Sequence, residues 1–148
     1  MKASDFRLIE YFSLKEVERT GANVPLVKFL TIFFLDKFRK AIKRRVYLLA
    51  NGLNSGKHKS KKHPDGEAVD CYIKGKLIAL TVFKAAIKAG FRGIGIYWNP
   101  YKKEYRFHFH INGDYQFWSA IRVRDKRGRE KWKYGALIVD PKIKGAVR

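Results

Sequence analysis

Cysteine is almost absent from this sequence. The single cysteine, Cys71, has no partner for an internal disulfide, so a secreted, disulfide-linked scaffold is excluded. The paired Cys-x-x-Cys spacings of structural zinc sites are missing as well. Cys71 lies inside an apolar run, which favours a buried, inert thiol over a nucleophile.

Long hydrophobic runs are also missing. The longest, around residues 27–35, is interrupted by Lys28 and followed by Asp36, and it is far too short to span a bilayer. The first ten residues mix polar and apolar side chains without the apolar centre of a signal peptide. We therefore expect neither a transmembrane segment nor a signal peptide.

Acidic residues are scarce. There are 13 Asp and Glu against 33 Lys and Arg, a formal net charge of +20. The positive field of such a chain attracts polyanions. A nucleic acid, an anionic cell wall and a membrane surface are all candidate partners. With 148 residues, of which 46% are hydrophobic and 15% aromatic, we expect one globular domain over residues 1–148 with a real core. The basic tail from about residue 140 is expected to fray.

Helix signals dominate the first third of the chain. Ser13 and Glu16 form a capping box, which predicts a short helix that ends near Gly21. Pro25 fits the first position of a longer helix, and apolar residues recur at helical spacing from there to about Arg44.

Strand signals dominate the rest, apart from one more amphipathic helix over residues 75–89 that Gly90 closes. The predicted strands are residues 46–50, 68–73, 94–98, 105–111, 116–124 and 129–137. Helices followed mostly by strands favour an α+β fold, with N-terminal helices packed on a small antiparallel sheet.

Histidine is scarce too, and three of the four histidines fall in residues 63–70 and 106–110. Side chains alternate faces along a strand, so Phe107 and Phe109 are expected to face the core while His108 and His110 share the other face. Those two histidines would lie about 7 Å apart. This separation suits one metal ligand and one group that acts on the metal-bound water.

The segment before the second predicted strand contains a turn. Pro64 and Gly66 match the second and fourth positions of a type I turn, which would fold His63 back toward Asp70. If the two strands are neighbours, Asp70 and His110 can meet. Two histidines, one aspartate and an open fourth position are typical of a catalytic zinc site, although each piece also has an ordinary structural explanation.

The pattern His63-x-x-Gly66-x-Ala68-x-Asp70 resembles the signature of the zinc D-alanyl-D-alanine metallopeptidases. That family includes carboxypeptidases and phage L-alanyl-D-glutamate endopeptidases that cut peptidoglycan stem peptides. Residues 93–97 and 109–111 resemble later family segments, and Trp118 resembles a tryptophan often found soon after them. The likeness covers roughly residues 12–118, and it implies the fold shared by hedgehog proteins and these peptidases.

The resemblance implies roles for four residues. His63, Asp70 and His110 would hold a zinc ion, which would lower the pKa of its bound water and polarise the scissile carbonyl. His108 matches the first histidine of the His-x-His version of the family and would be the general base or transition-state stabiliser. Other members of the family have a glutamate three residues before the last ligand, and here that position is Phe107.

Three departures from the family concern substrate binding and the groups around the metal. Lys61 stands where the family usually has serine, residues 51–54 lack the arginine that commonly binds a substrate carboxylate, and Asn112 replaces an aspartate. The candidate substrate-binding residues are Lys57, Lys61, Lys62, Tyr97 and Trp118, with Lys59 as a further basic substitute for the arginine.

The resemblance also implies a setting. The substrate would be a peptidoglycan peptide, the partner an anionic cell-wall surface, and the protein a monomeric phage-type enzyme of cell-wall lysis or entry. It would be made in the host cytoplasm and act at the bacterial wall or in the periplasm.

Two rival functions stay open. His108-Phe109-His110 also fits the His-hydrophobic-His pattern of rolling-circle nucleases, and the positive charge would suit DNA. Those enzymes need a nucleophilic tyrosine on a later helix, and neither Tyr115 nor Tyr134 lies in a helical pattern. A basic nucleic-acid-binding module could stack bases on tryptophans, although tryptophans in such positions are more often cross-strand residues; these are Trp98, Trp118 and Trp132.

Overall fold

The computed structural model describes residues 1–135, so the predicted basic tail and the end of the last predicted strand lie outside the described residues. The fold is a mixed α/β domain whose strands form one sheet. None of the helices within residues 1–135 is long and apolar enough to cross a membrane. In chain order the elements are η1 (Ala3–Leu8), α1 (Leu14–Glu18), η2 (Val24–Leu26), α2 (Phe29–Ile42), β1 (Tyr47–Leu48), β2 (Ala68–Lys74), α3 (Ala79–Ala89), β3 (Gly93–Asn99), β4 (Glu104–His110), β5 (Gln116–Arg124) and β6 (Glu130–Tyr134).

The capping box is confirmed. The Ser13 amide donates to Glu16 Oε2 at 2.9 Å, and the Glu16 amide donates back to Ser13 Oγ at 3.2 Å. The other two helices begin later than predicted. Pro25 lies in the 3₁₀ turn η2, and α2 starts only at Phe29 because the backbone of Lys28 is extended. The extended backbone of Ile78 likewise delays the start of α3 to Ala79.

The six strands lie in the order β1-β2-β4-β3-β5-β6. The prediction of an antiparallel sheet is wrong at one pair, because β3 and β5 run parallel. The β3–β4 hairpin places His110 opposite Gly93, and the short link after β4 delivers Gln116 to the other side of Gly93. Strand β5 therefore begins where β3 begins and runs the same way. Residue alternation is the same in both orientations and could not reveal this.

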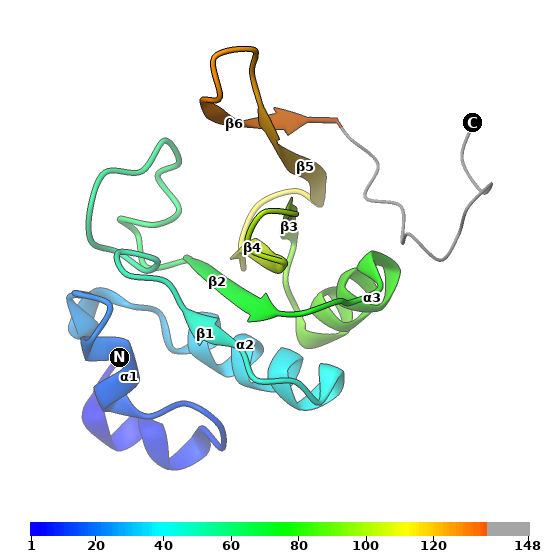
Figure 1. Ribbon diagram of the computed structural model, residues 1–148. Coiled ribbons are helices and arrows are strands. Elements are labelled where there is room, and N and C mark those ends of the chain that lie inside the picture. The colour runs from blue at the N-terminus through cyan, green and yellow to red at the C-terminus, as the bar shows by residue number, and fades with distance from the viewer. Residues whose placement is uncertain (136–148) are drawn as a thin grey trace.

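Helices α2 and α3 cover one face of the sheet, and the long loop between β1 and β2 lies on the other side (Figure 1). On the helix side, Phe38 of α2 packs edge-on against Phe107 and Phe109 of β4, with ring centroids 5.9 and 4.9 Å apart. The predicted inward orientation of these two phenylalanines is confirmed, since both are at most 1% exposed. The alternate residues of β4 therefore face the loop.

Cys71 of β2 is fully buried on the helix side. Burial, together with the nearby Asp70 carboxylate, raises the pKa of the thiol well above its usual value. The expectation of an inert structural cysteine is thus consistent with its position.

Candidate metal centre

The loop before β2 brings His63 onto the sheet. The Gly66 amide donates to the His63 carbonyl at 2.9 Å, which closes the predicted turn. Gly66 has a φ of +71°, and a Cβ atom there would overlap the Leu26 carbonyl. Glycine is therefore required at this position for both its backbone conformation and its close approach to another segment.

Three side-chain atoms from three segments meet on the open face of the sheet. His63 Nε2 lies 3.2 Å from Asp70 Oδ1, His108 Nδ1 lies 2.9 Å from the same oxygen, and the two nitrogens are 3.1 Å apart. Asp70 and His108 are direct partners in the β2–β4 register, so the sheet itself fixes their proximity. All three edges of this triangle are short enough for one ion to contact every atom.

The hydrogen bonding of His63 fixes which nitrogen is free. His63 Nδ1 lies 2.7 Å from the Leu53 carbonyl, and because a carbonyl can only accept, Nδ1 must carry the proton. In the neutral ring Nε2 is then an unprotonated acceptor that faces the acceptor oxygen of Asp70. Two acceptors this close need a cation or a donated proton between them. A backbone carbonyl that orients a histidine in this way is a common arrangement behind metal ligands.

The fourth histidine joins the cluster from the loop. The ring of His58 stacks on that of His63, with centroids 3.8 Å apart and an interplanar angle of 16°. Its Nε2 lies 2.7 Å from the Ser55 carbonyl. His58, His63 and Asp70 each offer a ligand atom within 4.8 Å of the others, and this group could hold a metal ion.

His110 lies one step further from the aspartate than the sequence suggested. Its direct partner on β2 is Ala68, whereas Asp70 faces His108. His110 Nδ1 is 3.3 Å from His108 Nε2, so the order in space is Asp70, His108, His110. The expected meeting of Asp70 with His110 is therefore replaced by contact with His108.

The protonation states suit a metal centre. Burial alone would raise the pKa of Asp70, but the adjacent His108 and His63 rings, when protonated, outweigh burial and lower that pKa to about 2. Burial, reinforced by the neighbouring charges of His108 and Lys62, lowers the pKa of His110 to about 4. At neutral pH Asp70 is therefore a carboxylate and His110 a neutral imidazole, which are the forms that bind metals.

Two glycines of β3 make room for the site. A Cβ atom on Gly93 would overlap the ring of His110, and one on Gly95 would come within 2.5 Å of the Trp118 ring. Trp118 in turn donates its Nε1–H to the Tyr97 hydroxyl at 2.6 Å. Burial is the main reason that the pKa of Tyr97 rises to about 12, which keeps this phenol protonated.

The triangle opens into a cleft of about 430 Å³. Of the proposed substrate-binding residues, Tyr97 and Trp118 line this cleft, whereas Lys57, Lys61 and Lys62 do not. Lys62 instead pairs with Glu67 at 3.2 Å. The basic residues that line the cleft are Lys59 and Arg106.

Sequence reasoning missed the positions of His58 and Arg106. His58 precedes His63 by five residues in a polar loop, and no periodic spacing marks it as a neighbour of the other histidines. Strand alternation puts Arg106 on the same face of β4 as His108 and His110, and this signal could have placed it in the cleft.

The tyrosines and tryptophans behind the rival functions lie in strands or links. Tyr115 is 70% exposed in the link before β5, and Tyr134 belongs to β6, so neither is on a helix. Trp98 packs across the hairpin on Tyr105 with ring centroids 4.6 Å apart, a cross-strand role. Of the three tryptophans, Trp118 and Trp132 line the cleft, whereas Trp98 does not.

Together these features define a mixed α/β domain with a His/His/Asp cluster on the floor of an open cleft. Neither a protein-family model, nor a curated protein, nor a solved structure matches the chain.

Proposed function

We propose that the protein is a zinc-dependent peptidase that hydrolyses the stem peptides of peptidoglycan, as a D-Ala-D-Ala carboxypeptidase or an endopeptidase. The observation that carries the proposal is the triangle of His63 Nε2, Asp70 Oδ1 and His108 Nδ1, with edges of 2.9 to 3.2 Å beside an open cleft. The likeness of residues 63–70 to the peptidase signature supplies the substrate class.

The donor set suits zinc. Zinc binds imidazole nitrogen and carboxylate oxygen, and catalytic sites combine three protein ligands with one open position. Two nitrogens and one oxygen meet here, and the cleft leaves one side accessible. When bound, zinc would polarise a carbonyl group and lower the pKa of water.

The chain's own residues prepare this chemistry. The Leu53 carbonyl holds His63 in one tautomer, and His110 contacts the far nitrogen of His108. Asp70 contributes a negative charge at neutral pH, which offsets part of the charge of a divalent ion. Lys59 and Arg106 line the cleft, where carboxylates of a stem peptide could bind, and Arg106 is also paired with Glu104 at 2.9 Å.

Metal removal tests the function. Purified peptidoglycan should release new peptide termini when incubated with the protein, and a chelator should abolish this release because the ligands alone cannot polarise the carbonyl. Added zinc should restore it. Mass spectrometry of the products identifies the bond. Unchanged release in chelator, or cleavage of single-stranded DNA with manganese in place of peptide release, would exclude a zinc peptidase.

Metal content distinguishes His108 from His110. We expect His108→Ala to lose zinc, because His108 Nδ1 contacts both other donors. His110→Ala should retain zinc with an affinity about 10- to 100-fold lower, the usual effect of removing an outer partner. The family resemblance assigns the opposite roles. Zinc lost from His110→Ala and kept by His108→Ala, measured by atomic absorption, would restore that assignment.

A further inference from the structure

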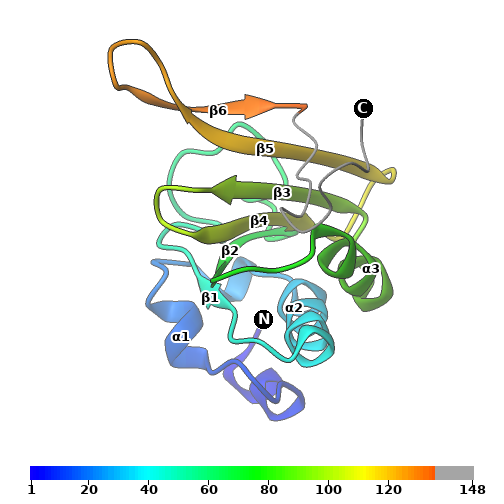
Figure 2. The same ribbon diagram turned by 45° about the vertical axis from the view of Figure 1, so that its right-hand side comes forward.

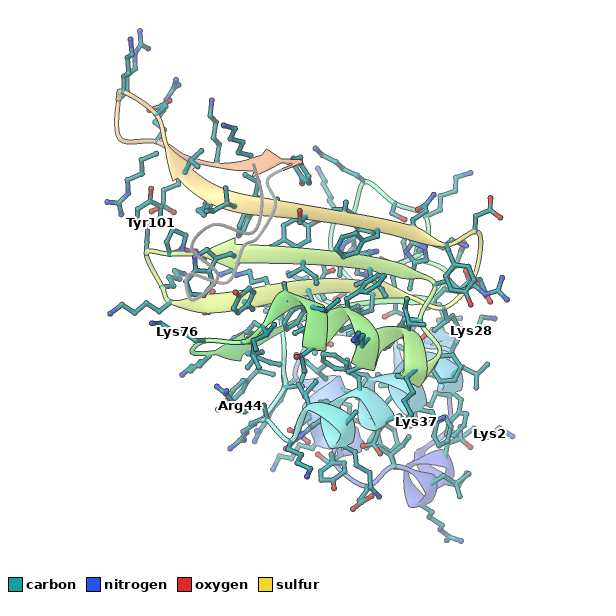
Figure 3. All side chains as sticks on the ribbon, turned by 90° about the vertical axis from the view of Figure 1, so that its right-hand side faces the viewer. Lys2, Lys28, Lys37, Arg44, Lys76 and Tyr101 are labelled. Carbon is teal, nitrogen blue, oxygen red and sulfur yellow. The ribbon has the colours of Figure 1, made fainter. Side chains whose placement is uncertain are left out.

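The hairpin of β5 and β6 carries a concentration of positive charge. Residues 122–133, here called the basic arm, contain seven Lys and Arg side chains and two acidic ones. Figures 1 and 2 show the loop of this hairpin projecting beyond the neighbouring strands. In Figure 3 long side chains extend from the same loop away from the rest of the molecule. The arm therefore presents its charge to solvent and to large partners.

The two acidic residues of the arm are already paired. Glu130 accepts from Arg122 at 3.3 Å and from Arg124 at 3.2 Å. Asp125 accepts from Arg129 Nε at 2.8 Å. The remaining four cations are exposed and have no salt bridge within residues 1–135; they are Lys126, Arg127, Lys131 and Lys133. Four unpaired cations on one short ribbon favour an anion with several charges over a single ion.

Arginines of the arm cover the ring of Trp132, the one aromatic residue of the arm, and the ring of Tyr101 beside it. The Arg122 guanidinium lies over the Trp132 ring at 5.0 Å, and Tyr97 packs edge-on against the same ring at 5.2 Å. Arg124 covers Tyr101, labelled in Figure 3, at 4.0 Å. Stacked bases need a free ring face. The arm therefore suits a polymer recognised by its charge better than one recognised by its bases.

The arm adjoins the cleft. Trp132 and Tyr134 of β6 line the cleft that contains His63 and Asp70. Their neighbours in sequence, Lys131 and Lys133, alternate to the other face of the strand. A polymer bound to the arm would be held next to the cleft without filling it.

We propose that the basic arm binds an anionic phosphodiester polymer of the bacterial cell wall and so concentrates the protein on its substrate. The location of that polymer in the wall rests on the proposed peptidase function, whereas the binding itself depends only on the arm. Because the attraction is electrostatic and exposed, it should weaken as salt is added.

The test removes the four unpaired charges. The arm variant is Lys126→Gln, Arg127→Gln, Lys131→Gln and Lys133→Gln. The matched control loses the same charge elsewhere, at exposed Lys15, Lys76, Lys84 and Lys88, each changed to Gln. Co-sedimentation with purified walls, intact or stripped of phosphodiester polymer, is measured at about 50 and 150 mM salt in chelator, so that no hydrolysis intervenes.

We expect the arm variant to bind intact walls at least about tenfold more weakly than the wild type, since it loses four exposed cations that would each be attracted to an anionic surface. Removal of the phosphodiester polymer from the walls should weaken binding by the wild type to the same extent. It should leave binding by the arm variant unchanged. The proposal would be overturned if the arm and control variants bound walls equally well. It would also be overturned if the wild type bound stripped and intact walls equally well. The proposal would also be overturned if the arm variant lost binding to single-stranded DNA but bound walls as well as the wild type does. Arm-dependent wall binding without peptide release would support the arm and count against the peptidase.

Discussion

His63→Ala is expected to lose bound zinc and to lower peptide release from peptidoglycan about 10³-fold or more, because metal polarisation contributes several kcal/mol to the transition state. His63 is the best-fixed member of the cluster. It is 2% exposed, it is held by the Leu53 carbonyl, and it contacts both Asp70 and His108. Zinc content and initial rates on the same preparations measure both effects.

Loss of fold must be separated from loss of metal in that variant. Asp70→Asn keeps the shape of the side chain and removes its charge, so it should lose zinc while remaining folded by circular dichroism. His58→Gln serves as the neighbouring control. His58 stacks on His63 from the loop, but it is not part of the short triangle, and its replacement should lower activity about tenfold or less. Full peptide release by Asp70→Asn would show that the cluster has no catalytic role.

Gly93→Ala is expected to destabilise the protein although it adds only one methyl group. The added methyl group would overlap the His110 ring, which is itself 5% exposed and has little space to move. Strand β3 is flanked by β4 and β5, so its backbone cannot withdraw. Crowding of this kind typically costs about 1 to 3 kcal/mol, and the upper value corresponds to a fall in melting temperature of roughly 6 to 12 °C for a chain of this size.

Two other glycines provide the comparison for Gly93. Gly95→Ala should instead displace Trp118, whose ring lies against Gly95 and beside the His108 and His110 rings, and should lower activity. Gly128→Ala introduces strain at a φ of +76° but meets nothing within 4 Å, so it should destabilise by about 1 kcal/mol. Thermal denaturation of the three variants ranks them. A Gly93→Ala protein as stable as the Gly128→Ala protein would mean that His110 does not occupy the space beside β3.

Local features of this protein were readable in the sequence because their causes are local. The capping box depends on Ser13 and Glu16, three residues apart, and the turn that presents His63 depends on residues 63–66. Alternation along β4 separated Phe107 and Phe109 from the histidines. The helix starts were less readable, because the extended backbones of Lys28 and Ile78 follow from packing and have no distinct sequence pattern.

The composition of the site was only partly readable. The sequence placed His63, Asp70 and the two histidines of β4 in one region, since strand alternation and one turn suffice for that. It could not set the β2–β4 register, in which a shift of two residues would exchange the partners of Asp70. Nor could it place Lys59 in the cleft while Lys57 and Lys61 remain outside.

Composition, spacing and turns act over a few residues, and they were enough to predict a basic chain with helices, strands and a small set of histidines near one aspartate. The tertiary structure decided that β5 runs parallel to β3, that His108 faces Asp70, and that the basic arm borders the cleft. Those outcomes depend on which strands pair and in which register. Pairing is settled by the burial of side chains from distant segments, an energy that no short stretch of sequence contains.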